Sequence, residues 1–119
     1  MRKLLLSLAA FTLVLAGQEN SNWKIQYELP KQVKANSDTP LTVRITGLDG
    51  KPVAGAEVET ILTMVEMDHG EFRESARQVN PGIYEAKQKF IMAGAWQIEV
   101  KAKKGAISAS QKFRYEVKE

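Results

Sequence analysis

The chain has 119 residues, with 17 Lys and Arg, 14 Asp and Glu, one His and no Cys. This length closes one hydrophobic core, which excludes a doubly wound nucleotide-binding domain, a full barrel enzyme and several linked modules. The absence of Cys excludes thiol chemistry, Cys-ligated zinc and iron–sulfur clusters. The basic residues are scattered and are not interleaved with aromatics, so we expect no nucleic-acid partner.

Residues 1–16 have the pattern of a signal peptide, with a short basic start, an apolar stretch from Leu4 to Leu15, and a small residue, Ala16, for cleavage. We expect export to the periplasm or cell envelope, followed by an exposed linker over residues 17–22. An uncleaved anchor is the alternative. Leu15-Ala16-Gly17 resembles the start of a lipobox, but Gln18 stands where a lipoprotein needs cysteine. Membrane contact is expected only through the signal segment, or through a lipid anchor if one is present.

Residues 23–119 are predicted to form one all-β domain. Apolar and polar residues alternate with a period of two, and Asp-Gly and Pro-Gly turn signals separate the runs. About seven short strands without any helical period predict an immunoglobulin-like antiparallel β-sandwich. The expected strands cover residues 23–29, 41–46, 57–64, 75–79, 83–91, 96–102 and 107–117. The stretches 31–40 and 65–74 are expected to be irregular.

The methionines and the single histidine are candidate metal ligands. Every Met after the initiator and the only His lie in two short segments: Met64, Met67 and His69 in one, and Met92 in the other. Thioether sulfur is a soft ligand that favours Cu(I), and neutral imidazole suits copper in both oxidation states. Met67 and His69 are two residues apart, so they project to one side of an extended segment.

The Met67–His69 segment follows a different strand, and the two segments could meet at one end of the sandwich, with Met92 expected at the end of its strand, on the same face as Phe90. Structural interpretations remain open for each residue. Methionine commonly fills gaps in cores, and Met64 shares strand parity with Val58 and Leu62. A lone histidine in a loop is more often simply solvated.

Catalytic constellations are missing from the sequence. The acidic residues of 66–74 have no partner acid at a second strand end, and Asp49-Gly50 lacks the other ligands of a calcium loop. No serine has a nucleophile-elbow context, and no glycine-rich phosphate loop is present. We therefore expect that the protein is not an enzyme.

Four blocks of sequence together resemble a known family: D-G-x-P-V-x-G-A-x-V at 49–58, the Met67-Asp68-His69-Gly70 segment that follows Met64, P-G-x-Y at 81–84, and the block from Phe90 to Trp96. In order and spacing they resemble the YtkA-like/FixH-like exported bacterial domains, over about residues 41–100. The resemblance implies a β-sandwich outside the cytoplasmic membrane that handles copper.

The resemblance also implies partners and site residues. The partners would be copper-transport or cytochrome oxidase assembly proteins. The ligands would be Met64, Met67, His69 and Met92, whereas Gly94 and Trp96 would be structural. The N-terminal histidine that related carriers use for Cu(II) is missing, which favours Cu(I).

Two functions follow from the sequence. The first is an exported, non-enzymatic Cu(I) carrier or metallochaperone-like domain. The alternative is an immunoglobulin-like interaction module of an envelope complex that binds no metal. A carbohydrate-binding sandwich is less favoured because it needs an exposed aromatic platform, whereas Trp23, Trp96 and the tyrosines fall at core positions.

Overall fold

The computed structural model describes residues 23–119, so the predicted signal peptide and linker lie outside the described residues. The described part contains no helix, and therefore no helical segment that could cross a membrane. Its seven strands are β1 (Lys24–Glu28), β2 (Asp38–Thr46), β3 (Glu57–Met64), β4 (Phe72–Asn80), β5 (Ile83–Lys89), β6 (Gly94–Lys104) and β7 (Ile107–Val117).

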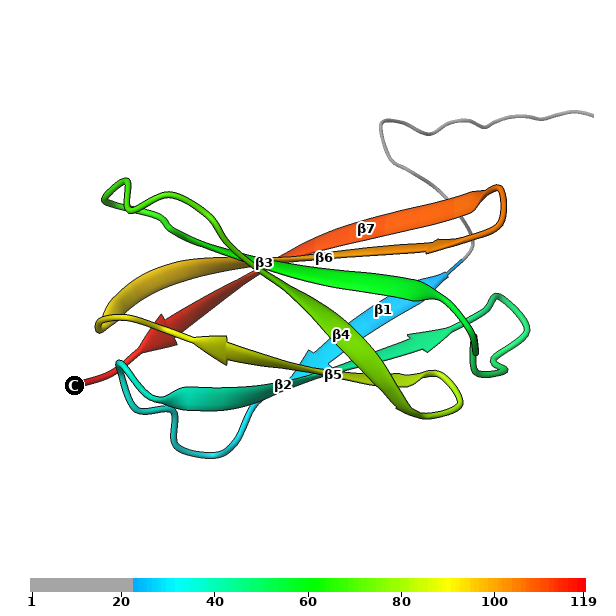
Figure 1. Ribbon diagram of the computed structural model, residues 1–119, viewed down its shortest axis with the longest axis horizontal. Coiled ribbons are helices and arrows are strands. Elements are labelled where there is room, and N and C mark those ends of the chain that lie inside the picture. Colours follow the sequence, from blue (N-terminus) through cyan, green and yellow to red (C-terminus); the bar gives the residue numbers. More distant parts are fainter. Residues whose placement is uncertain (1–22) are drawn as a thin grey trace, which may run out of the picture.

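The strands form one antiparallel sheet that folds back on itself as a sandwich (Figure 1). The order β1-β2-β5-β4-β3-β6-β7 puts β1, β2 and β5 in one layer and β3, β6 and β7 in the other. Strand β4 belongs to both layers, because its first half pairs with β3 and its second half with β5. The edge strands meet where the rings of Tyr27 and Phe113 lie 4.6 Å apart. The predicted all-β antiparallel sandwich is confirmed.

The alternation of the sequence explains which side of each strand is buried. In β2 the side chains of Leu41, Val43 and Ile45 are fully buried, and the residues between them are more exposed. Strand β6 supplies Trp96 and Ile98 to the same core. A period of two thus becomes one buried and one solvated face. Each such burial stabilises the fold by about 1.5–3 kcal/mol, which suits a chain without disulfides.

A buried amide joins the two layers where β4 crosses between them. The Nε2 atom of Gln88 donates to Thr60 Oγ1 at 2.8 Å, to the Thr60 carbonyl at 3.2 Å and to the Phe72 carbonyl at 3.1 Å. The Thr60 hydroxyl donates to the carbonyl of Glu74 at 3.2 Å. Strand β5 pairs with β4 only over Ile83–Glu85, so this amide supplies hydrogen bonds that the ladder lacks further along.

Several strand boundaries differ from the sequence predictions, and three of the differences matter for the site. Strand β4 begins at Phe72, inside the stretch predicted to be irregular, because a strand shared by two layers shows no regular alternation. Strand β2 begins at Asp38, within the polar stretch predicted to be irregular. Strand β5 ends at Lys89, so Met92 lies in the following loop and does not continue the buried face of Phe90.

One end of the sandwich, which we call the clamped end, is formed by the β2–β3 connection (47–56) and the β4–β5 turn. The buried Tyr84 hydroxyl donates to the Val53 carbonyl at 2.7 Å and accepts from the Ala56 N–H at 3.0 Å. Gly82 has φ +77°, and a Cβ at this position would lie 2.6 Å from Pro52 Cβ. Only glycine fits both the backbone conformation and this close approach.

Candidate metal centre

The two methionine-bearing segments lie together at the other end of the sandwich, which we call the methionine end. The β3–β4 loop (65–71) and the β5–β6 loop (90–93) both leave the sheet here (Figure 1). Their strands are directly paired, because Met64 is opposite Trp96 and the Val65 N–H donates to the Ala95 carbonyl at 3.0 Å. Antiparallel pairing of β3 with β6 therefore brings together segments that are distant in sequence.

Met64 is the candidate ligand that belongs most closely to the core. Its side chain is partly buried and packs against the core cluster. Its Cε lies 3.0 Å from the position that a Cβ on Gly94 would occupy. Gly94, which has φ +133°, therefore makes room for the Met64 side chain while breaking the chain before β6.

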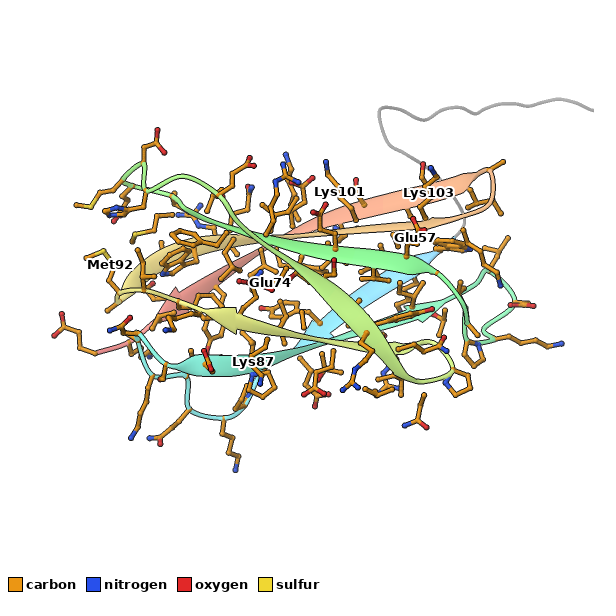
Figure 2. The ribbon with its side chains drawn as sticks, in the orientation of Figure 1. Glu57, Glu74, Lys87, Met92, Lys101 and Lys103 are labelled. Carbon is orange, nitrogen blue, oxygen red and sulfur yellow. The ribbon has the colours of Figure 1, made fainter. Side chains whose placement is uncertain are left out.

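Met92 has a fixed backbone and an exposed side chain. Its carbonyl accepts a hydrogen bond from Trp96 Nε1 at 3.0 Å. Trp96 is fully buried, with edge-to-face contacts to Phe90 at 5.5 Å and to Phe72 at 6.0 Å between ring centroids. The Met92 side chain, by contrast, is 38% exposed and lies at this end of the molecule (Figure 2). A buried indole thus anchors a loop that presents its thioether to solvent.

The β3–β4 loop presents the other two candidates. Met67 is 53% exposed, and His69 is exposed. Between them Asp68 Oδ1 accepts from the Gly70 N–H at 2.9 Å, which closes a local turn with Gly70 at φ +81°. Within residues 23–119 the imidazole of His69 has no hydrogen-bond or ion-pair partner, so its ring nitrogens are available to a ligand.

The arginine next to this loop is paired with two carboxylates, one of which, Glu71, lies in the loop itself. Arg73 forms ion pairs with Glu71 at 2.8 Å and with Glu59 at 3.3 Å. The hydrogen bond and charge of Glu71, with a smaller contribution from Glu59, raise the pKa of the Arg73 guanidinium. The guanidinium is therefore directed along the sheet surface by these carboxylates.

The donor set available at the methionine end is soft. It combines the thioethers of Met64, Met67 and Met92 with one imidazole, and such donors suit a monovalent copper ion. Residues 23–119 contain no group of three or more His, Cys, Asp or Glu side chains arranged to hold a metal. These residues therefore offer no candidate for a calcium or zinc site built from several carboxylate, imidazole or thiolate side chains.

A groove on the described chain lies away from these residues. It has a volume of about 950 Å³ and runs over the outer face of β3, β6 and β7, next to Glu57, Lys101 and Lys103 (Figure 2). Glu57 is paired with Lys103, and Glu59 with Lys101, across the strands. Alternating opposite charges are typical of a solvated sheet face. The methionine end is therefore a better candidate for the functional site than this groove.

A family assignment comes from the sequence profile of the YtkA-like family, which matches residues 17–101 and so covers well over half of the chain. The chain belongs to the YtkA-like family. Among solved structures, a conjugative transposon lipoprotein from Bacteroides eggerthii is similar, with 7% identity and a TM-score of 0.44 over 79% of this chain and 96% of that chain. No curated protein matches the sequence.

In this YtkA-like chain, two of the motifs that carry the resemblance build the fold. The 49–58 block and the 81–84 block contact each other at the clamped end, through the Tyr84 hydroxyl and the packing of Gly82 against Pro52. The methionine blocks lie at the opposite end. The 49–58 and 81–84 blocks are therefore structural, whereas the methionine blocks carry the candidate ligands.

Sequence reasoning missed the buried hydrogen bonds that support the methionine end. Gln88 and the Trp96 indole N–H were not identified as groups that hold its two loops. A signal for Gln88 exists in the sequence, because it alternates with Ala86 and Phe90 and therefore falls on the buried face of β5. No sequence pattern reveals that the indole of Trp96 donates to the carbonyl of Met92.

Proposed function

We propose that the protein is an exported, non-enzymatic carrier that binds Cu(I) at the methionine end through Met67, His69 and Met92. Met64 is the adjacent fourth candidate, whose side chain packs on the core and reaches Gly94. The observation that carries the proposal is the pairing of β3 with β6, continued by the Val65–Ala95 hydrogen bond, which puts both methionine loops at one end.

Exposure of the donors supports a carrier in preference to a storage site. Of the three methionines that the structure describes, Met67 and Met92 are the most exposed, at 53% and 38%. A metal held by exposed thioethers is accessible to the ligands of a second protein, so exchange does not require the sandwich to open. The buried Trp96 and the Gln88 amide hold the strands that bear these loops, which limits the ordering that binding requires.

The proposed setting is the periplasm or cell envelope, and the proposed partners are proteins of copper transport or cytochrome oxidase assembly. The setting rests on the signal-peptide pattern of residues 1–16. The partners rest on the resemblance to copper-associated exported domains. A compartment that favours oxidation also suits a site built from thioethers and imidazole without thiolate.

The test is a titration of the folded full chain with Cu(I) against a competing chelator. We compare the parent with the double variant Met67→Leu/His69→Ala and with Leu48→Ala, which removes an exposed apolar side chain at the clamped end. Loss of two ligands is expected to weaken binding at least about tenfold, or about 1.4 kcal/mol. Leu48→Ala is expected to bind as the parent does.

Two results would contradict the proposal. One is a folded parent that takes up no Cu(I), which would be the behaviour of an interaction module. The other is a double variant that binds as tightly as the parent, which would remove the metal from the methionine end.

A further inference from the structure

We infer that Met67 and Met92 are reversible oxidation sites, at which a hydroperoxide converts the empty carrier into a form that no longer binds Cu(I). The inference deepens the proposed function and rests on it. It starts from the different exposure of the three methionines: Met67 is 53% exposed and Met92 is 38% exposed, whereas Met64 is partly buried and packed against the core.

The chemistry is a two-electron transfer of oxygen. A sulfur lone pair attacks one oxygen of hydrogen peroxide, the S–O bond forms and the O–O bond breaks. The departing hydroxide takes up the proton of the hydroxyl group now bound to sulfur and leaves as water, so the sulfur is oxidised to the sulfoxide and the peroxide is reduced. Because the chain has no Cys, its thioethers are its only sulfur groups, and the exposed ones react first.

Met64 differs from the other two because its side chain packs against the core, where a sulfoxide is unfavourable. Its Cε is 3.0 Å from the Cβ position of Gly94, and its residue pairs with the fully buried Trp96. A sulfoxide oxygen placed here would be a polar group against an apolar core, which is costly. Oxidation of Met64 is therefore expected to be slower than that of Met67 and Met92, and to speed up when the end of the β3–β6 pair opens.

Oxidation of the exposed pair changes the donor set. A sulfoxide is polar, and its oxygen is a harder donor than the thioether that Cu(I) prefers. Two of the proposed ligands are lost together, which leaves His69 and the partly buried Met64. A bound soft ion occupies the same sulfur lone pairs, so the loaded carrier should resist the oxidant that inactivates the empty one.

The first experiment maps oxidation of the metal-free full chain by hydrogen peroxide, using peptide mass spectrometry to follow the gain of one oxygen at each methionine. We expect Met67 to react first, Met92 next, and Met64 at least about tenfold more slowly until denaturant is added. Equal rates at Met64 and Met67 in the folded protein would overturn the inference.

The second experiment repeats the mapping with bound Ag(I), a soft monovalent ion that stands in for Cu(I) and is not oxidised by peroxide. Protection is expected at Met67 and Met92, by about tenfold or more for a saturated site. Protection at neither residue would contradict the role of Met67 and Met92 as ligands. The order of oxidation in the metal-free protein is tested separately, by the first experiment.

The third experiment measures consequence and reversal. The oxidised protein should bind Cu(I) no more tightly than the variant Met67→Leu/Met92→Leu, and treatment with both methionine sulfoxide reductases should restore the parent affinity. An oxidised, folded protein that binds Cu(I) as tightly as the parent would overturn the inference. A parent that oxidises in the expected order but never binds Cu(I) would refute the proposed function and retain the modification sites.

Discussion

The two ends of the sandwich are built in opposite ways. At the clamped end side chains bond to loop backbone: the Tyr84 hydroxyl reaches Val53 and Ala56, and Gln78 Oε1 accepts from the Gly55 N–H at 2.8 Å. At the methionine end the corresponding bonds run from Trp96 Nε1 to the Met92 carbonyl and from the Gly70 N–H to Asp68 Oδ1, and the thioethers of Met67 and Met92 are exposed. The same strands thus join a tightly bonded end to an end that presents its side chains.

In the proposed carrier, this difference separates the residues that stabilise the fold from those that bind the ligand. The clamped end and the core determine the fold, so the methionine end does not have to bury its own side chains. Substitutions at the clamped end should therefore change the free energy of unfolding more than substitutions at the methionine end. Matched pairs of residues at the two ends allow this expectation to be tested directly.

The largest difference is expected between Gly82→Ala and Gly70→Ala. Both glycines have positive φ, +77° and +81°, so a side chain costs about 1–2 kcal/mol at either position. At Gly82 the new Cβ would also meet Pro52 Cβ at 2.6 Å, whereas nothing lies within 4 Å at Gly70. Overpacking adds about 1–3 kcal/mol, so we expect a loss of about 2–5 kcal/mol for Gly82→Ala.

Urea unfolding of the two variants and the parent measures these losses. Because the backbone cost is shared, the difference between the variants isolates the contact with Pro52. Equal losses would mean that the clamped end tolerates this Cβ by local movement, and the contrast between the ends would be weaker than the structure indicates.

A second, smaller effect is expected for the amide that joins the layers. In Gln88→Leu the carbonyls of Phe72 and Thr60 and the Thr60 hydroxyl lose a buried donor. We expect a loss of about 1–3 kcal/mol in the free energy of unfolding, together with faster amide exchange at the start of β4. Gln78→Leu, which removes an exposed hydrogen bond, should cost about 0.5 kcal/mol or less.

Urea unfolding and hydrogen exchange check this pair. If Gln88→Leu unfolds at the same urea concentration as the parent, the amide does not hold β3, β4 and β5 together, and the support of the β3–β4 loop must come from β6 alone.

Most of the fold could be predicted from the sequence, because most strands have one buried and one solvated face. Strands β2 and β6 alternate so regularly that Leu41, Val43, Trp96 and Ile98 can be assigned to the core directly. Strand β4 could not be placed well, since it changes partner from β3 to β5 and has no fully buried side chain. Alternation predicts burial only where a strand faces one core along its whole length.

The candidate site was only partly predictable for a related reason. The sequence allows the segments bearing Met67 and Met92 to meet at one end of the sandwich, but only the pairing of β3 with β6 brings their loops there. Strand β5 ends at Lys89, and in the loop that follows the Met92 carbonyl accepts a hydrogen bond from Trp96 Nε1. Such a side-chain bond to the backbone follows from tertiary packing and has no signature in local sequence.

The smallest predicted effect lies between the two ends, where edge strands β1 and β7 meet at Tyr27 and Phe113. Burial, and secondarily the charge of Tyr115, raises the pKa of the Tyr27 hydroxyl. The unfolded chain therefore ionises first, above about pH 10, so stability is complete below that pH and falls as pH rises through the higher pKa of the folded state.

Tyr27→Phe keeps a ring against Phe113 and should lessen this alkaline loss. Urea midpoints of parent and variant at a series of alkaline pH values give the comparison. Parallel curves for the two proteins would show that the meeting of β1 and β7 does not resist ionisation, and that the sandwich is closed on this side by packing elsewhere.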